Sequence, residues 1–466
     1  MVRVPPSPLG KVLPRHAFDT AREALADTRV VLINGARQSG KSTLAAQLGT
    51  NALWRTLDDA PTRAAALSDP AGFVAPTGQM QIIDEVQRAP ELLLAIKAVV
   101  DQNADPGQFL LTGSARVLAM RGVTDALPGR TETIELWPLS QGEIEHEADG
   151  FVDAIFNLGA DFRHESDESR PAYIERLVRG GFPGAIGRPA PRRARFLDSY
   201  VGDLVNRDVV QLSEIQRGPE MHTLIEVLAG RSGQTLAAGS LATRIGLPRD
   251  TVARYLRLLE EVFLIKRIPA WARNINTRAT AAPKLAFVDS GIAANLLDQD
   301  AASLRRPDAP LGALMEGFVA MEIARQLTWS HTRARLSHYR TRDGVEVDLV
   351  LEDRRRRVIA IEVKAASTVR AEDFRGIRHL ADRIGDDLVV GIVLYTGAQT
   401  LPFGNRLRAV PISALWRTPE PGLALMAPSA RRRAVSCVRP RHHDARPRVH
   451  LSLDAREHPK APGRAG

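Results

Sequence analysis

The residues best suited to chemistry in this 466-residue sequence form a glycine-rich loop near the N-terminus. Residues 30–33 predict a buried strand, the motif Gly-x-x-x-x-Gly-Lys-Ser occupies 35–42, and a helical pattern begins at Lys41. In this strand-to-helix context the motif indicates a P-loop, whose backbone N–H groups and lysine hold phosphates and whose serine ligates Mg²⁺. We therefore predict ATP and Mg²⁺ as cofactors, with nucleotide contacts from Gly35, Ala36, Arg37, Gln38, Ser39, Gly40, Lys41, Ser42 and Thr43.

A second apolar stretch, residues 79–83, ends in Asp84 and Glu85. Downstream of a P-loop, a strand with this ending is typical of a Walker B site. Asp84 would hold Mg²⁺, directly or through water, together with Ser42. Glu85 would act as general base toward the attacking water, which makes Lys41 and Glu85 the first catalytic candidates.

A third apolar stretch, residues 108–111, is followed by two hydroxyl side chains, Thr112 and Ser114. Either could lie beside the γ-phosphate as a sensor, although an ordinary hydroxyl-rich turn fits the spacing nearly as well. Arg130 follows a Pro-Gly turn and could serve as an arginine finger, within its own chain or toward a neighbouring subunit. A surface salt bridge would explain the same arginine equally well.

These candidates need a scaffold, and the alternation of strands with helices predicts an α/β domain with a mostly parallel sheet covered on both faces. We assign residues 1–25 to a leader helix, 26–145 to a P-loop AAA-type ATPase domain, and 146–215 to a helical connector or lid.

Residues 216–275 predict a winged helix-turn-helix, with three short helices followed by a strand. The third helix offers Thr251, Arg254, Tyr255 and Arg257 as contacts to a DNA groove or phosphates. Alternatively, the module is a lid or an interdomain spacer that touches no DNA.

Residues 276–416 predict a mixed α/β domain with the charge pattern of a restriction-endonuclease-like fold. Asp348 lies on one strand of a predicted hairpin, and Glu362 and Lys364 lie on the next. Asp348 and Glu362 would hold a divalent metal, Lys364 would steady the water or phosphate, and Glu316 could add a ligand. The alternative is a solvated strand face, and such a fold does not by itself imply cleavage.

The net charge of +9 is unevenly distributed. Ten Lys or Arg and three acidic residues lie between Arg431 and Gly466, so this stretch contributes +7, and we predict a disordered basic tail over 417–466. The rest carries only +2, so the overall positive charge is poor evidence that the folded part binds nucleic acid. A single cysteine, Cys437, and the lack of any long apolar run predict a cytoplasmic protein without a membrane span.

Motifs spread along residues 20–416 together resemble a prokaryotic family of AAA-superfamily ATP-binding proteins with a C-terminal domain of unknown function. The motifs are Asn-Gly-Ala-Arg-Gln-Ser-Gly-Lys-Ser-Thr at 34–43, Ile-Asp-Glu-Val-Gln at 83–87, Leu-Thr-Gly-Ser at 111–114, Leu-Pro-Gly-Arg at 127–130, Trp-Pro-Leu-Ser at 137–140, Asp-Leu-Val-Asn-Arg-Asp at 203–208, Asp-Ser-Gly at 289–291, Glu-Val-Asp at 346–348 and Glu-Val-Lys at 362–364. The resemblance implies an AAA-type ATPase core, a winged helix and a nuclease-like domain. It also supports Thr112 or Ser114 as sensor and Arg130 as arginine finger.

Our leading hypothesis is an Mg-dependent ATPase that acts as a molecular switch coupled to its C-terminal domains. The alternatives are an ATP-gated, metal-dependent nuclease and a DNA-binding regulator without catalysis. Candidate partners besides ATP are DNA, RNA, another protein, or further copies of the chain that Arg130 would contact.

Overall fold

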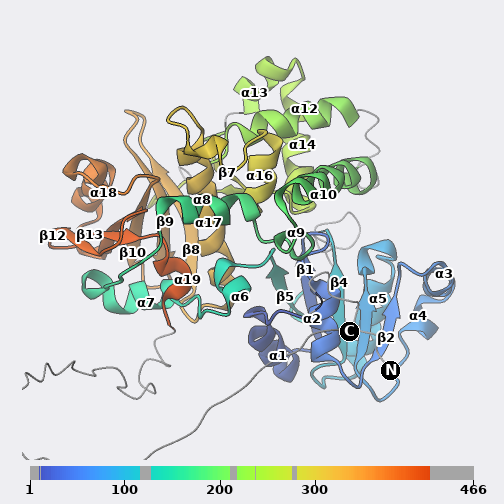
Figure 1. Cartoon of the computed structure of the whole chain (residues 1–466). Coiled ribbons are helices and arrows are strands. Elements are labelled where there is room, and N and C mark those ends of the chain that lie inside the picture. The colour runs from blue at the N-terminus through green and yellow to red at the C-terminus, as the bar shows by residue number, and fades with distance from the viewer. Residues whose placement is uncertain are drawn as a thin grey trace, which may run out of the picture. The chain divides into compact units, whose positions relative to one another are not determined.

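The computed structural model describes residues 10, 12–115, 127–209, 218–236, 238–274 and 281–419 (Figure 1). Within them the chain is α/β, as predicted. From residue 420 onward the predicted basic tail lies outside the described residues, so its disorder stays a prediction.

The N-terminal sheet has five strands, and every neighbouring pair in it is parallel. The strands are β1 (Val30–Gly35), β2 (Leu53–Thr56), β3 (Gln81–Asp84), β4 (Phe109–Gly113) and β5 (Thr131–Leu136), in the order β2-β3-β4-β1-β5. Because β4 lies between β1 and β3, the carboxyl ends of these three strands meet at one edge. Ligands of open parallel sheets bind at that edge.

Helices cover both faces of this sheet, and the side chains of β1 alternate between them as a pleated strand requires. Val30 and Leu32 belong to an apolar cluster with α3 and α5, whereas Val31 and Ile33 pack with α1 and α2. The helices here are α1 (Ala17–Asp27), α2 (Lys41–Leu48), α3 (Ala60–Ser68), α4 (Pro70–Phe73), η1 (Val86–Arg88) and α5 (Leu92–Gln102).

The predicted connector is helical, and it also packs on the last sheet of the chain. Helix α6 (Gln141–Glu145) precedes this segment, whose elements are α7 (Phe151–Leu158), η3 (Gly159–Asp161), α8 (Arg170–Arg179), α9 (Pro183–Ile186), α10 (Ala190–Asp203) and the π-helical η4 (Leu204–Val209). His164 exchanges hydrogen bonds with Thr400, and Glu165 forms a β-bridge with Gln399. This segment is therefore tied to residues more than two hundred positions away.

Three helices and a two-stranded sheet follow, at the place where the sequence predicts a winged helix. They are α12 (Gly218–Ala229), α13 (Ala238–Ile245), α14 (Arg249–Glu261), β6 (Ile265–Ile268) and β7 (Lys284–Phe287). Strand β6 pairs antiparallel with β7, which lies beyond the predicted boundary at residue 275. The first residue of β7 is Lys284, so the pairing of β6 with β7 places a lysine near the C-terminal sheet.

The C-terminal sheet is mixed and has six strands in the order β12-β13-β11-β10-β9-β8. Leu349 and Leu351 of β9 cluster with α17, while Val350 between them clusters with α18, so helices cover both faces. The elements are α16 (Ser290–Leu296), η5 (Ser303–Arg305), α17 (Leu311–Trp329), β8 (Ala334–Arg340), β9 (Glu346–Asp353), β10 (Val358–Lys364), η6 (Ala371–Phe374), α18 (Arg375–Ile384), η7 (Gly385–Asp387), β11 (Leu388–Tyr395), β12 (Leu401–Gly404), β13 (Leu407–Pro411) and α19 (Ala414–Arg417).

A membrane span would need a longer or more apolar helix than any found among the described residues.

Candidate functional site

The glycine-rich loop joins β1 to α2, and its lysine is held inside the loop. Lys41 Nζ donates to the carbonyl oxygens of Gly35 and Ala36 at 3.1 and 2.9 Å, and only 4% of Lys41 is exposed. Gln38 has a φ of 60°, a conformation that is uncommon for a residue with a side chain and that clusters at ligand sites. The loop thus holds a buried ammonium group against the carbonyl groups of Gly35 and Ala36.

The P-loop serine touches the end of β3, as a shared Mg²⁺ site requires. Ser42 Oγ donates to Asp84 Oδ1 at 2.8 Å, and Thr112 Oγ1 donates to the same oxygen at 2.5 Å. The Thr112 hydroxyl also accepts the backbone N–H of Glu85 at 3.1 Å. Thr112 therefore positions the two acidic residues, and its single O–H donor is used by Asp84.

Glu85 has a φ of 60° and is oriented by Gln87, a residue whose role motif analysis missed. The side-chain amide of Gln87 donates to Glu85 Oε2 and lies 2.8 Å from Ser114 Oγ. Gln87 closes the motif at 83–87, and this position was the sequence signal for it. Of the two predicted sensors, Ser114 lies beside the Glu85–Gln87 pair and Thr112 beside Asp84.

The two acidic side chains respond differently to the same surroundings. Burial raises the pKa of Asp84, and hydrogen bonds from Thr112 and Ser42 offset this only in part. Burial also acts to raise the pKa of Glu85, but the charge of Lys41 and the hydrogen bond from Gln87 outweigh it and bring this pKa below its ordinary value. Glu85 is therefore a carboxylate at neutral pH and can accept a proton.

The chemistry of these donors fits an Mg²⁺ ion. Asp84 and Ser42 offer hard oxygen ligands, and Mg²⁺ in nucleotide sites takes one or two protein ligands beside water and phosphate oxygens. The described residues contain no group of three or more His, Cys, Asp or Glu placed to hold a metal.

Arg15, in the stretch just before α1, is the second residue that motif analysis missed. Its guanidinium donates to the Ser39 carbonyl of the P-loop and to the Trp137 carbonyl, both at 2.7 Å, and to Glu143 Oε1 at 3.0 Å. No sequence motif connects Arg15 to residues 24 to 128 positions away. Arg15 thus joins the P-loop to the β5–α6 segment, residues 137–145.

Arg130 lies at the opposite edge of the sheet. It precedes β5, and the parallel register puts Val30 opposite Thr131 and Gly35 opposite Leu136. About five residues of strand, or roughly 17 Å, therefore separate Arg130 from the P-loop of its own chain. The within-chain finger is corrected on this ground, since Arg130 pairs with Asp101 instead. A finger that reaches a neighbouring subunit stays a prediction.

Three family models match the chain. An AAA domain covers residues 27–145, a domain of unknown function, DUF8612, covers 170–303, and another, DUF4143, covers 311–415. The chain is an AAA-domain protein with a C-terminal DUF4143 domain. The predicted combination of an AAA domain with a C-terminal domain of unknown function is confirmed, while the winged helix and the restriction-endonuclease-like fold stay predictions. A P-loop AAA domain implies nucleotide binding in general terms.

Relatives match over most of the length of the chain. The uncharacterized proteins Rv2008c of Mycobacterium tuberculosis and Mb2031c of Mycobacterium bovis are each 28% identical over 407 residues, which is 87% of this chain and 85% of theirs.

A Walker-type ATPase and a variant of RuvB are among the solved structures similar to this one. The Walker-type ATPase PABY2304 of Pyrococcus abyssi has a TM-score of 0.38 and 13% identity over 61% of this chain and 96% of its own. A variant of RuvB from Thermotoga maritima has a TM-score of 0.25 and 20% identity over 54% of this chain and 86% of its own. Both TM-scores are low, so the fold description rests on the strand order.

A buried lysine occupies the acidic cluster of the DUF4143 domain. Lys284 Nζ lies 2.8 Å from Asp348 Oδ1, 2.7 Å from Glu346 Oε1 and 3.5 Å from Glu316 Oε2. Burial opposes the charged ammonium, but these carboxylates outweigh it and raise the pKa of Lys284 above its ordinary value. This lysine was not among the predicted site residues.

The predicted metal ligands lie near one another but bind ammonium groups. Strands β9 and β10 are antiparallel neighbours, and Glu362 Oε1 lies 3.0 Å from Lys364 Nζ. Burial and the charge of Asp348 raise the pKa of Glu362 to about 7. Together with the arrangement around Lys284, this means that the structure does not provide the metal site predicted from Asp348, Glu362, Lys364 and Glu316.

On helix α14 the predicted DNA contacts separate into two groups. Tyr255 is 1% exposed and packs in the core, so it cannot meet a DNA groove, because Val252, Tyr255 and Leu259 share the buried face of the helix. Arg254 and Arg257 are exposed. DNA contact by these two arginines and by the partly exposed Thr251 stays a prediction.

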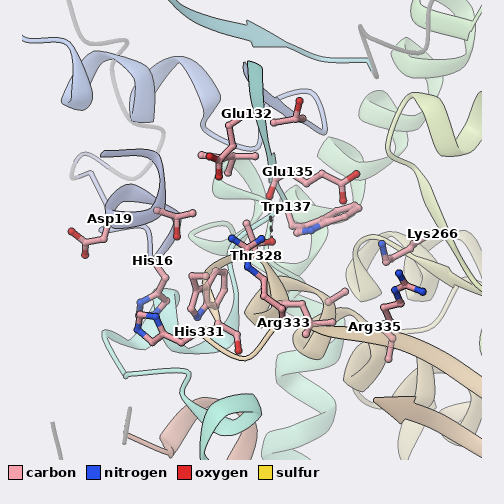
Figure 2. A pocket seen from close by; sticks show the side chains of 18 of the residues that line it. His16, Asp19, Glu132, Glu135, Trp137, Lys266, Thr328, His331, Arg333 and Arg335 are labelled. Atoms are coloured by element: carbon pink, nitrogen blue, oxygen red, sulfur yellow. Dashed lines mark hydrogen bonds between the residues drawn. The ribbon is translucent and has the colours of Figure 1, made fainter. Parts of the chain in front are cut away.

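Figure 2 shows a groove of about 1040 Å³ that borders the AAA domain. Acidic side chains of α1 and β5 line it, together with basic side chains of β6, of β8 and of the residue just before β8; those labelled are Asp19, Glu132, Glu135, Lys266, Arg333 and Arg335. Lys266 lies over the Trp137 ring, 4.9 Å from its centroid. The mixed charge does not suit a polyanion such as nucleic acid, and we assign no ligand to the groove.

Proposed function

We propose that this chain is an Mg-dependent ATPase that acts as a molecular switch coupled to its C-terminal domains. The observation that carries the proposal is the 2.8 Å contact between Ser42 and Asp84, which joins the P-loop to the acidic end of β3. These two side chains would hold Mg²⁺, which would neutralise charge on the phosphates. A cytoplasmic location, expected from the sequence, accompanies this proposal.

The side chains of the chain itself would perform the remaining steps. Lys41 would leave the carbonyl groups of Gly35 and Ala36 for the terminal phosphates, because a phosphate carries more negative charge than a carbonyl oxygen. Glu85 would accept the proton of the attacking water. Gln87 would keep the Glu85 carboxylate in place, and Thr112 would fix the backbone on which it stands.

The test is the rate of phosphate release from ATP by the purified full-length chain, with and without Mg²⁺, compared with Lys41→Ala. We expect activity that depends on Mg²⁺ in the parent and a loss of about 100-fold or more in the variant, as for other charged groups that stabilise a transition state. Lys97→Ala, on the outer part of α5, is the matched control and should behave like the parent. Equal turnover by the parent and Lys41→Ala would show that the site is wrong.

A polar network supports the coupling. Arg15 contacts both the P-loop and the β5–α6 segment, and its partner Glu143 is 3% exposed. In the same segment, the backbone N–H of Gln141 donates to Glu322 on α17 at 3.0 Å. A shift of the P-loop on nucleotide binding would thus reach a helix of the DUF4143 domain.

On α17, Arg325 extends this network further. It donates to Glu322 Oε1 at 2.6 Å, to the Pro138 carbonyl at 2.9 Å and to the Val288 carbonyl at 2.8 Å. Both side chains are at most 4% exposed, so solvent screens these contacts little. Residues from three family-matched regions therefore meet at one buried ion pair.

Hydrogen exchange tests the coupling. ATP should change amide exchange in α17 of the parent, and Arg15→Ala should bind ATP but lose this distant response. Arg22→Ala, an exposed arginine on α1, is the control that should keep it. A response in α17 that persists in Arg15→Ala would remove Arg15 from the coupling.

A further inference from the structure

In the acidic cluster beside Lys284, the cation is a lysine side chain of the same chain and not a metal ion. Asp348, Glu346 and Glu316 lie within the region matched by the DUF4143 domain, whereas Lys284 belongs to the region matched by DUF8612. The pairing of β6 with β7 and the packing of α17 on β7 bring the lysine to the carboxylates. A neighbouring part of the same chain thus supplies the positive charge.

The ammonium group is closely surrounded. The side chain of Lys284 is 3% exposed, and the side chain of Asp348, one of its two carboxylate neighbours on β9, is 9% exposed. The other oxygen of Asp348 accepts the backbone N–H of Val363 at 3.0 Å. Both oxygens of Asp348 are therefore engaged by groups of the chain itself.

Little room is left for a second cation. The cavity that remains among Lys284, Glu316 and Asp348 has a volume of about 10 Å³, which is about the space of one water molecule. Gly233 closes the cluster from the side, since a Cβ at this position would lie 2.8 Å from Glu316 Oε2. A hydrated divalent ion does not fit beside the ammonium group.

We propose that the Lys284 ammonium is the permanent cation of this cluster, and that a divalent metal binds there only when the ammonium is removed. The cluster then joins the DUF4143 domain to the β6–β7 sheet as a buried ion network. Asp348 and Glu362 carry out no metal-dependent cleavage in the native chain. The alternative of an ATP-gated nuclease loses its site.

Mn²⁺ titration tests the proposal, with free Mn²⁺ followed by its electron paramagnetic resonance. The full-length chain is used without nucleotide, so that the AAA site is the same in every variant. We expect Lys284→Ala to bind one Mn²⁺ per chain more than the parent, and Lys284→Ala combined with Asp348→Asn to lose this ion. A Lys284→Ala chain that folds but gains no ion would overturn the proposal.

Two further measurements do not depend on the folding of Lys284→Ala. Lys284→Met keeps most of the side-chain volume and should show the same gain of one ion. In the parent, Asp348→Asn should leave the number of bound Mn²⁺ ions unchanged, because no metal binds there. A parent chain that loses one Mn²⁺ ion on Asp348→Asn would show that the native cluster already holds a metal, against the proposal.

Discussion

Two lysines, Lys41 in the AAA domain and Lys284 beside the DUF4143 domain, are buried next to carboxylates, yet they are held in opposite ways. Lys41 Nζ contacts the carbonyl oxygens of Gly35 and Ala36, and the nearby Asp84 takes hydroxyl donors. Lys284 instead contacts its carboxylates directly. Residue types alone would describe both places as a lysine with acidic residues at the ends of strands.

The difference decides whether a site remains open to a ligand. A buried ion pair loses much of its stability when one partner leaves, because the other charge stays uncompensated. An ammonium group that donates to carbonyl oxygens can exchange them for a phosphate, which binds it more strongly. A carboxylate that accepts hydrogen bonds from hydroxyl groups remains negatively charged and can still bind a cation. The AAA site therefore has the electrostatics of a binding site, and the Lys284 cluster has those of a closed contact.

The largest expected effect is a loss of ATP hydrolysis, which involves the AAA site and not the Lys284 cluster. Glu85→Gln keeps the shape of the side chain but removes the base, so kcat for ATP should fall by about 10²–10⁴-fold while ATP still binds. Steady-state phosphate release and equilibrium binding of a fluorescent ATP analogue measure the two quantities. Glu91→Gln, an exposed glutamate of the same domain, is the control. Unchanged turnover in Glu85→Gln would exclude Glu85 as the base.

A smaller effect is expected from the hydroxyl groups that hold the acidic residues. Thr112→Val removes one donor from Asp84 and leaves the N–H of Glu85 without its acceptor. A hydrogen bond to a charged group contributes about 1.5–3 kcal/mol, so kcat should fall roughly 10- to 100-fold. Ser114→Ala removes a contact with Gln87 and a hydrogen bond to Glu85 but leaves Asp84 and the Glu85 backbone N–H with their partners, so it should cost less than about tenfold. The reverse order would identify Ser114 as the sensor of the γ-phosphate.

Local sequence patterns predicted the parts of the AAA site that lie within one strand-loop-helix unit. The loop of residues 35–42 and the acidic pair after β3 occur where the sequence placed them, because apolar runs and glycines determine them nearby. Arg130 shows the limit of this reasoning. A Pro-Gly turn indicates that an arginine is presented, but only the strand register shows which edge of the sheet it occupies.

Arg15 and Lys284 could not be found from sequence because their contacts join distant parts of the chain. Arg15 contacts Glu143, and Lys284 contacts Asp348, 64 residues away. Tyr255 is a different case. Val252, Tyr255 and Leu259 repeat at helical spacing, a pattern typical of a core face, so the prediction of Tyr255 as a DNA contact overlooked a signal that the sequence contains.

The two glutamates beside these lysines should also differ in how stability depends on pH. The pKa of Glu85 lies below its ordinary value, whereas burial and the charge of Asp348 raise the pKa of Glu316 to about 8. Lys284 is shared among three carboxylates, and Glu316 is the most distant of them at 3.5 Å. Glu316 is therefore the one that keeps a proton in the folded chain.

The sign of the effect follows from proton binding. From about pH 4.5 to 8 the folded chain holds a proton on Glu316 that the unfolded chain releases, so rising pH destabilises the fold by at most about 1.4 kcal/mol per pH unit. Glu316→Gln removes this dependence, and the stability of the parent relative to the variant should fall across that range in urea unfolding. Relative to Glu85→Gln, the parent should lose stability only as pH falls below about 4.5. Parallel curves for the parent and Glu316→Gln from pH 5 to 8 would mean that Lys284 keeps all three carboxylates ionised, and that the cluster holds more negative charge than one ammonium can balance.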